Sequence, residues 1–389
     1  MDDSWWLRLE DLDDDQKRVI NLPSDGTFLV TGPPGSGKSN LLLLRANYLT
    51  LAGRPNLLTL VFTRTLEEFF ASGAAAYSFE RSKISTWVRW GLRFLHQFGV
   101  EVRTAERFDD QRRQILDSLK ALLANRSDWK PYDTILLDEA QDLWPEEVEI
   151  LASLSRNLFA VADSRQKIYA GTDSVALLRQ LAGEQNTVDL KFHYRTGLKI
   201  CRVADKVGEG LPGYIRLEPS SNYNEQLFPS RVELVRRNDL VSQIETLIQQ
   251  LEAQVKAYPD GLLGVVCPRN EDLNAIYNRL METPLGKLCV KQSSTEGYVA
   301  FGGSARICLC TIHSAKGLEF RAVHLLAADT LSVFRERERN IAYVAVTRAK
   351  TSLSIYYSGS IAGYLEQAVL TANAVHSVPD LSSLFGGGR

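Results

Sequence analysis

The chain has 389 residues, of which 44% are hydrophobic and 24% charged, and its formal net charge is −2. This composition indicates a globular protein long enough for two or three domains, and without a global basic excess any contact with nucleic acid has to be local. The N-terminus is acidic and no apolar run approaches the roughly 18 residues of a membrane span, so we expect a cytoplasmic protein that makes no membrane contact.

The stretch at residues 27–39 gives the strongest local signal. An apolar run at 27–31 predicts a strand, and a glycine-rich turn then leads into an apolar helix. The turn fits G-x-x-x-x-G-K-S, the phosphate-binding loop, in which backbone N–H groups and the helix N-terminus converge on phosphate oxygens. The nucleotide-binding residues predicted from this pattern are Gly32, Pro33, Pro34, Gly35, Ser36, Gly37, Lys38, Ser39 and Asn40.

Within this loop, Lys38 would reach the β- and γ-phosphates of ATP and Ser39 would ligate Mg²⁺. A glycine-rich turn with an incidental lysine is the alternative, but the strand before the turn and the helix after it favour a nucleotide site. Upstream, the side-chain amide of Gln16 offers a donor and an acceptor that could read the adenine edge, although an isolated glutamine is more often a surface residue.

A second anchor follows the strand predicted at 132–137, where the chain reads Asp138-Glu-Ala-Gln-Asp142. A carboxylate at the carboxyl end of a strand lies where α/β sheets place their ligands. We expect Asp138 to hold the Mg²⁺ shell and Glu139 to polarise the attacking water. An exposed helix start is the alternative, which the phosphate-binding loop about 100 residues upstream disfavours.

The other predicted elements alternate between strand and helix. In the first half, further strands are predicted at 56–62, 158–163 and 188–192. One helix is predicted to end at about residue 98, and another to run from 107 to 125. In the second half, strands are predicted at 231–235, 261–266, 305–311, 322–327 and 352–357, and helices at 239–255 and 271–281. This alternation predicts mostly parallel sheets that are covered by helices on both faces.

The cysteines point to a reduced protein. Their number, five, is odd, and the sequence contains neither a C-x-x-C pair nor a cluster of histidines. Cys308 and Cys310 alternate within an apolar run, which predicts that both lie on one face of a buried strand. We therefore expect a cytoplasmic protein without structural zinc.

Asp138-Glu-Ala-Gln-Asp142 resembles a motif of superfamily-one helicases of the UvrD, Rep and PcrA kind. The resemblance spans nearly the whole sequence. Phe62-Thr63 and Ser85-Thr86 resemble the first two strand-contacting motifs, and the strongest matches, at 311–320 and 342–350, look almost unaltered. The resemblance implies an α/β fold of two RecA-like domains, each a mostly parallel sheet with helices on both faces. The ATP site would lie in the cleft between them.

The resemblance also implies roles for single residues. It assigns nucleotide contacts to Gln16, Tyr194, Gly317 and Glu319, coupling of the γ-phosphate to the strand to Gln166, and two arginine fingers to Arg195 and Arg348. Two guanidiniums facing Lys38 and Mg²⁺ suit the charge that develops on a transferred γ-phosphoryl group. Without the motifs around it, either arginine could equally form a surface salt bridge.

Single-strand binding requires stacking aromatic rings beside local positive charge. The candidates are Phe62, Thr63, Arg64, Thr86, Trp87, Tyr169 and His313, with Trp90 as a further aromatic nearby. For any single aromatic residue the core is the commoner location. Trp87 is the sharper candidate because it follows Ser85-Thr86 at a strand-to-helix junction.

We predict an ATP-binding domain at 1–190 with a small helical insertion around 88–130, a second domain at 191–378, and a disordered tail at 379–389. Family members usually carry two large insertions, called 1B and 2B. Only about 45 residues separate Trp87 from the strand at 132–137, and only about 115 separate Arg195 from Thr311. We therefore expect 1B to be reduced to a helix or two and 2B to be absent.

Two functional hypotheses follow. The first is an ATP-dependent motor on single-stranded nucleic acid, for which the resemblance implies DNA and 3′-to-5′ polarity without excluding RNA. This motor would unwind duplex poorly alone, so a protein partner would supply the missing duplex-binding surface. The second is a regulatory ATPase subunit that switches a nuclease or DNA-sensing partner in phage defence or DNA repair. A nucleotide kinase is disfavoured because the paired arginines and Gln166 would then have no role.

Overall fold

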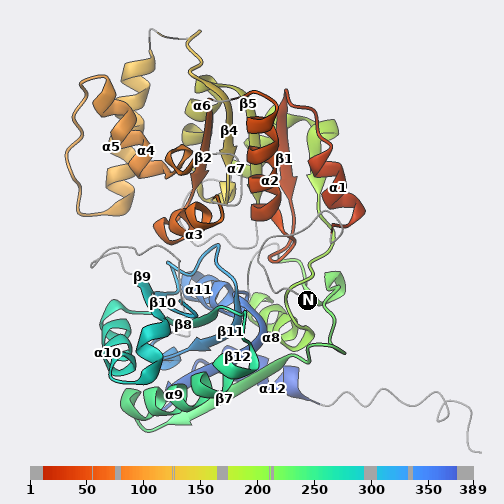
Figure 1. Cartoon of the computed structure of the whole chain (residues 1–389), viewed down its shortest axis with the longest axis vertical. Helices are drawn as coiled ribbons and strands as arrows, with labels where there is room; N and C mark the ends of the chain where they lie inside the picture. The colour runs from red at the N-terminus through yellow and green to blue at the C-terminus, as the bar shows by residue number, and fades with distance from the viewer. Residues whose placement is uncertain are drawn as a thin grey trace, which may run out of the picture.

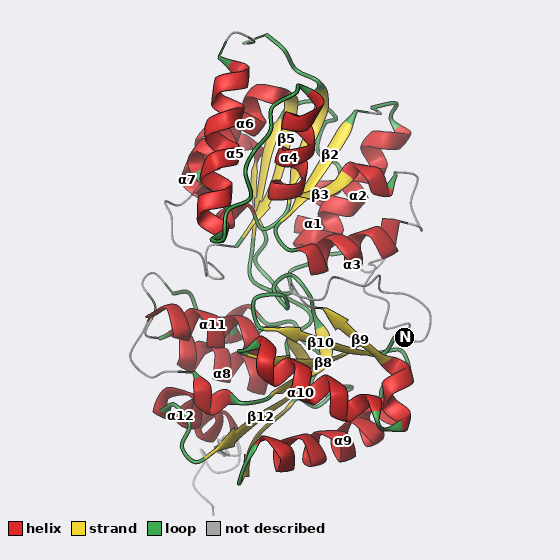
Figure 2. Cartoon of the chain, turned by 90° about the vertical axis from the view of Figure 1, so that its left-hand side faces the viewer, coloured by secondary structure: helices red, strands yellow, loops and turns green. Residues whose placement is uncertain are grey.

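The computed structural model describes residues 12–54, 56–74, 80–124, 126, 128–163, 174–209, 211, 214–292, 305–331 and 336–374. Over these ranges the chain forms an N-terminal unit (residues 12–189) and a C-terminal unit (residues 198–374), each built on one β-sheet (Figures 1 and 2). No helix in the described ranges is long and apolar enough to cross a membrane. The tail predicted at 379–389 lies outside the described residues.

The sheet of the N-terminal unit has the strand order β3-β2-β4-β5-β1-β6, and the strand pairs described in it are all parallel. Successive residues of a strand point to opposite faces. Accordingly, Phe28 and Val30 of β1 join one apolar core and Leu29 joins another. The strands are β1 (Thr27–Thr31), β2 (Leu57–Val61), β3 (Ile84–Thr86), β4 (Tyr132–Leu137), β5 (Ser155–Ala162) and β6 (Thr187–Asp189).

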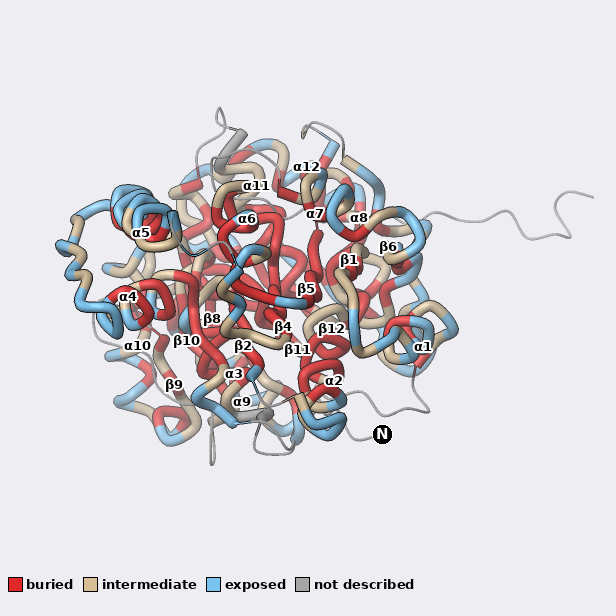
Figure 3. The backbone as a smooth tube through the Cα atoms, turned by 90° about the horizontal axis from the view of Figure 1, so that it is seen from above, coloured by how far each residue is buried: buried red, intermediate tan, exposed pale blue. Residues whose placement is uncertain are grey.

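Helices cover both faces of this sheet. Leu41 of α2 and Phe70 of α3 lie in the first core, whereas Trp90 of α4 and Ile115 of α5 lie in the second, together with residues of α6 and α7. Figure 3 shows the strands as buried backbone enclosed by partly exposed helices. The helices are α1 (Asp14–Ile20), α2 (Lys38–Leu51), α3 (Arg64–Ala74), α4 (Trp87–Gln97), α5 (Phe108–Leu123), α6 (Pro145–Leu154) and α7 (Ser174–Ala182).

The C-terminal unit repeats this plan with the strand order β7-β12-β11-β8-β10-β9, again with parallel pairs. Helices α9 and α10 cover one face, and α8, α11 and α12 cover the other. The strands are β7 (Arg231–Arg237), β8 (Leu263–Cys267), β9 (Cys289–Gln292), β10 (Ile307–Thr311), β11 (Phe320–Leu325) and β12 (Ala349–Ser358). The helices are α8 (Leu198–Gly208), α9 (Leu240–Ala257), α10 (Asn270–Met281), α11 (Glu336–Val346) and α12 (Gly363–Asn373).

The structure confirms the α/β class with two RecA-like units of parallel sheet, and it also corrects details. Cys308 and Cys310 share one core while Ile307 and Leu309 join the other, as the alternation predicted. The strand predicted at 188–192 ends at Asp189, because the chain there leaves the sheet to cross between the units. Helices α8, α11 and α12 and the short strand β9 were not predicted.

Candidate functional site

The phosphate-binding loop leaves β1 at residue 32 and enters α2 at Lys38. Gly35 and Gly37 have φ values of 77° and 85°, in the left-handed region that glycine adopts without strain. A Cβ atom added at Gly35 would lie 3.6 Å from the Cβ of Arg195 and 3.5 Å from the Oγ1 of Thr196. The loop therefore lies against the segment that leads to the C-terminal unit, and the positive φ of Gly35 is what favours glycine at this position.

Lys38 and Ser39 already make contacts suited to a phosphate and a metal ion. The Nζ of Lys38 donates to the carbonyl oxygens of Gly32 and Pro33, each at 2.8 Å. The Oγ of Ser39 donates to the carboxylate of Asp138, at 3.0 and 3.1 Å from its two oxygens. Hydroxyl and carboxylate oxygens at this spacing are ligands that Mg²⁺ accepts.

The two acidic residues of the predicted second anchor lie at the carboxyl end of β4. Burial raises the pKa of Asp138 to about 7, and the neighbouring charge of Glu139 adds to the effect. Glu139 has a φ of 49°, which is rare for a residue with a side chain, and such strain is common at functional positions. Its carboxylate accepts a hydrogen bond from the amide of Gln141.

The C-terminal unit and the segment before it contribute two arginines. The guanidinium of Arg195 pairs with the carboxylate of Glu319 at 2.7 Å, and that of Arg348 donates to the carbonyl of Leu318 at 3.0 Å. Burial alone would raise the pKa of Glu319, but Arg195 and Lys350 outweigh it and hold that pKa at about 2.

These groups surround one small cavity of about 30 Å³. It is lined by Pro34, Gly35, Gly37, Lys38, Ser39, Asn40, Asp138, Glu139, Arg195, Gly317, Glu319 and Arg348. Residues more than 300 positions apart in the sequence therefore meet at this cavity. This cavity is too small for a triphosphate, so a nucleotide fits only when the side chains or the units move apart.

Gln16 and Tyr194 lie beside the loop. Gln16 is 2% exposed, and its Nε2 donates to the carbonyl of Ser36 at 2.9 Å. The hydroxyl of Tyr194 donates to the carboxylate of Asp13, and burial followed by this bond raises the pKa of the tyrosine. Gln16 is consequently a buried residue of the loop region and not an ordinary surface glutamine.

Residues 190–197 cross from the N-terminal to the C-terminal unit and carry Arg195. Their backbone is tied to both units, because the N–H of Leu190 donates to the carbonyl of Thr31 at 2.7 Å and that of Gly197 donates to the carbonyl of Lys350 at 2.8 Å. Arg195 is therefore held between two anchored ends.

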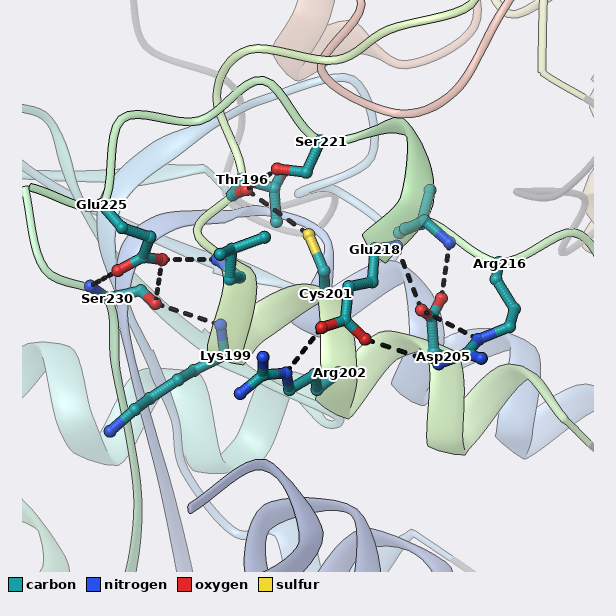
Figure 4. A network of polar contacts seen from close by, with 12 residues as sticks. Thr196, Lys199, Cys201, Arg202, Asp205, Arg216, Glu218, Ser221, Glu225 and Ser230 are labelled. Carbon is teal, nitrogen blue, oxygen red and sulfur yellow. Dashed lines mark hydrogen bonds and ion pairs between the residues drawn. The ribbon is translucent and has the colours of Figure 1, made fainter. Parts of the chain in front are cut away.

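A polar network braces the start of the C-terminal unit just beyond this crossing (Figure 4). The carboxylate of Asp205 accepts from the backbone N–H of Leu217 at 2.6 Å and of Glu218 at 3.1 Å. The carboxylate of Glu225 accepts from the N–H of Leu198, the first residue of α8, at 2.6 Å. These bonds hold the loop at 214–230 against α8. The sequence alone does not identify the residues that fix this loop.

A second cavity, of about 610 Å³, lies between the units on the side of α3 and α4. The described candidates for strand binding line it, with the exception of Trp90: Phe62, Thr63, Arg64, Thr86, Trp87 and His313. Trp87 is only 4% exposed, and its ring packs at a tilt against that of Trp90, with 5.3 Å between the ring centres; Trp90 is itself a core residue at 3% exposure. Little of the Trp87 side chain is therefore open to the cavity. Gln166 and Tyr169 lie outside the described residues.

A buried ion pair connects the two cavities, and sequence reasoning missed it. Lys316 of the C-terminal unit pairs with Asp142 of the N-terminal unit, and both side chains are fully buried. The Nζ of Lys316 lies 5.9 Å from the ring centre of Phe62 in the second cavity, and the next residue, Gly317, lines the first. Both residues belong to motifs that the sequence analysis identified. No local sequence pattern indicates that they pair, because they lie 174 positions apart.

Gly317 explains how closely the units approach at this point. Its φ is 81°, and a Cβ atom there would come within 2.7 Å of the Cδ2 of Leu66 on α3. Any larger residue would clash and would also be strained. The contact between α3 and the segment at 314–319 therefore depends on this glycine.

Comparison with known proteins gives two family matches. Residues 16–172 match the model of an AAA domain, and residues 306–356 match that of a UvrD-like helicase C-terminal domain. A "Probable DNA helicase" of Mycoplasma pneumoniae is 28% identical over 250 residues, covering 56% of this chain and 42% of that protein. DNA helicase IV of Escherichia coli is 26% identical over 252 residues, covering 57% of this chain and 33% of that protein. The matched region thus spans less than half the length of these relatives.

Among solved structures, the C-terminal domain of a possible DNA helicase from Lactobacillus plantarum is 18% identical with a TM-score of 0.33. The match covers 46% of this chain and 96% of that one.

Proposed function

We propose that this chain, a UvrD/Rep-type superfamily-one helicase by its two family matches and its relatives, is an ATP-driven motor that moves along single-stranded DNA in the 3′-to-5′ direction. One observation carries the proposal. Lys38 and Asp138 from the N-terminal unit meet Arg195 and Arg348 at a single cavity, so a nucleotide bound there would contact both units at once.

The residues present fit ATP and Mg²⁺. The loop has two glycines with positive φ, and it presents the N-terminus of α2 to phosphate oxygens. Ser39 and Asp138 would hold Mg²⁺, which when bound offsets phosphate charge. Glu139 would orient and polarise the attacking water, and Arg195 and Arg348 would stabilise the negative charge that grows on the γ-phosphoryl group.

The proposed motor needs a link between the nucleotide cavity and the cavity proposed to hold the strand. A nucleotide that moves the units would also shift the second cavity, because Lys316 is paired with Asp142, lies near the ring of Phe62 in the second cavity, and directly precedes Gly317, which lines the first. A cycle of closure and release at the first cavity would therefore change the grip on a strand held in the second. This is the physical link that a translocating enzyme requires.

We further propose that the chain unwinds duplex weakly by itself. Between Trp87 and Tyr132 the described residues form only α4 and α5, and between Arg195 and Thr311 they form the elements of the C-terminal unit. Separating strands requires base-pair stacking of about 1.4 kcal/mol per step to be overcome at a gripped junction. A partner protein would supply that grip.

A paired assay on one preparation tests the proposal. ATP hydrolysis would be measured with and without a single-stranded DNA oligonucleotide, and displacement of a tailed duplex would be measured in parallel. We expect stimulation by single strands with little displacement. Processive unwinding by the chain alone would contradict the weak-unwinding proposal. A rate of ATP hydrolysis that single-stranded DNA does not change would contradict the motor proposal and favour the regulatory ATPase subunit.

A further inference from the structure

Phe108 is an exposed aromatic residue at the mouth of the second cavity. It is the first residue of α5, in the short helical insertion, and 47% of its surface is exposed. Its ring meets that of Phe62 edge-on, with 6.2 Å between the ring centres. The two rings come from different parts of the N-terminal unit and border the same cavity.

A buried arginine makes cation–π contacts with both rings. The guanidinium of Arg112, one turn along α5, lies 5.7 Å from the ring centre of Phe62 and 5.6 Å from that of Phe108. Arg112 is 1% exposed and makes a two-point ion pair with the buried carboxylate of Glu147, with 2.8 Å from its Nε to the Oε1. Its ring contacts are therefore fixed in place, and both phenyl groups are pre-positioned.

We propose that Phe108 is a stacking surface for an unpaired nucleobase of the strand, beside Phe62. The inference rests on the proposed function and names a binding residue that neither the motifs nor the resemblance assigned. An unpaired base has free π-faces, whereas the faces of a base inside a duplex are covered by its neighbours. The exposed arginines Arg64 and Arg89 on the same cavity can meet the strand's phosphates.

The insertion also offers a matched control. Phe98 lies on the same helical unit at 39% exposure, but its ring packs against Phe94 and Trp129 and does not line the cavity. Removing Phe98 therefore tests the loss of an exposed aromatic ring without touching the proposed base site.

The experiment measures binding of a fluorescent dT oligonucleotide and of an abasic strand of the same length and charge. For Phe108→Ala we expect affinity for the dT strand to fall about 10-fold, within the range for removing one stacking residue. Affinity for the abasic strand and ATP hydrolysis without DNA should be unchanged. Phe108→Tyr should retain dT binding, Phe108→Leu should not, and Phe98→Ala should match the parent.

Each outcome bears on a distinct statement. If Phe108→Ala binds the dT strand as the parent does, or loses affinity equally for the abasic strand, Phe108 does not stack on a base and the inference is wrong while the motor stands. If the parent chain binds neither strand, the proposed function fails and takes this inference with it.

Discussion

Replacing Lys316 by methionine removes the cation of a buried ion pair while keeping most of its volume. Lys316 and Asp142 are both 0% exposed, so neither charge can turn to water when its partner is lost. Breaking such a pair from one side typically costs about 3–5 kcal/mol. We expect Lys316→Met to lose a free energy of unfolding of that size at pH 8.

The cost should depend on pH in a defined direction. Burial raises the pKa of Asp142 from 3.8 to about 6 even though Lys316 opposes the shift. A folded-state pKa above the ordinary value means that protonation favours the folded state, so this group's contribution is fully present below about pH 3.8 and is lost as the pH rises through 6. Without Lys316 the pKa should rise further, so Lys316→Met should be much less damaging at pH 5 than at pH 8.

Urea unfolding followed by tryptophan fluorescence is a suitable measurement, because the six tryptophans lie between residues 5 and 144, in the half of the chain that contains Asp142. Asp142→Asn and the double variant complete a thermodynamic cycle. We expect the double variant to regain much of the loss, since it buries no unpaired charge. A loss below about 1 kcal/mol for Lys316→Met at pH 8, or strictly additive single losses, would refute the reasoning.

Three further predictions concern the cavity of the phosphate-binding loop and the core of the C-terminal unit. Lys38→Ala should abolish ATP hydrolysis, and Glu139→Gln should keep ATP binding while turnover falls at least about 10³-fold; phosphate-release and nucleotide-binding assays check both, and near-normal turnover would argue against the assignment. Arg348→Ala should lower kcat far more than ATP affinity, because its cation acts mainly in the transition state; equal losses in the two would count against a finger role. Burial lowers the pKa of His324 to about 3, so the folded state excludes a proton and stability falls as the pH drops below about 6.5, by about 2 kcal/mol at pH 5. His324→Gln should flatten that dependence in urea unfolding, and an unchanged slope would show that His324 is not its source.

Contiguous patterns allowed the fold class and most of the nucleotide-loop cavity to be predicted. The strand, turn and helix around Lys38 form one continuous stretch, and the strand before Asp138 ends in three apolar residues, so the sequence close to each anchor is enough to predict it. Pairings between distant residues were not accessible. Nothing near Arg112 in the sequence indicates that it joins Glu147, or that it underlies two phenyl rings.

Aromatic residues show the same division. The sequence located Trp87 at a strand-to-helix junction, where it is found, but its burial depends on Trp90 and the rest of the second core. Phe108 carries no signal of its own in the sequence, because an exposed phenylalanine at a helix start resembles many others. Only the fold brings it opposite Phe62.

The crossing at residues 190–197 has a mechanical consequence. It is the covalent link between the units and also the bearer of Arg195, and its ends are hydrogen-bonded to Thr31 on one side and Lys350 on the other. Because both ends of this short link are hydrogen-bonded, a rotation of one unit would be transmitted directly to the guanidinium of Arg195. With Arg195 in its proposed role, the same eight residues would join the units and contact the nucleotide, so we expect a longer link to lower ATP hydrolysis even with every side chain of the cavity intact.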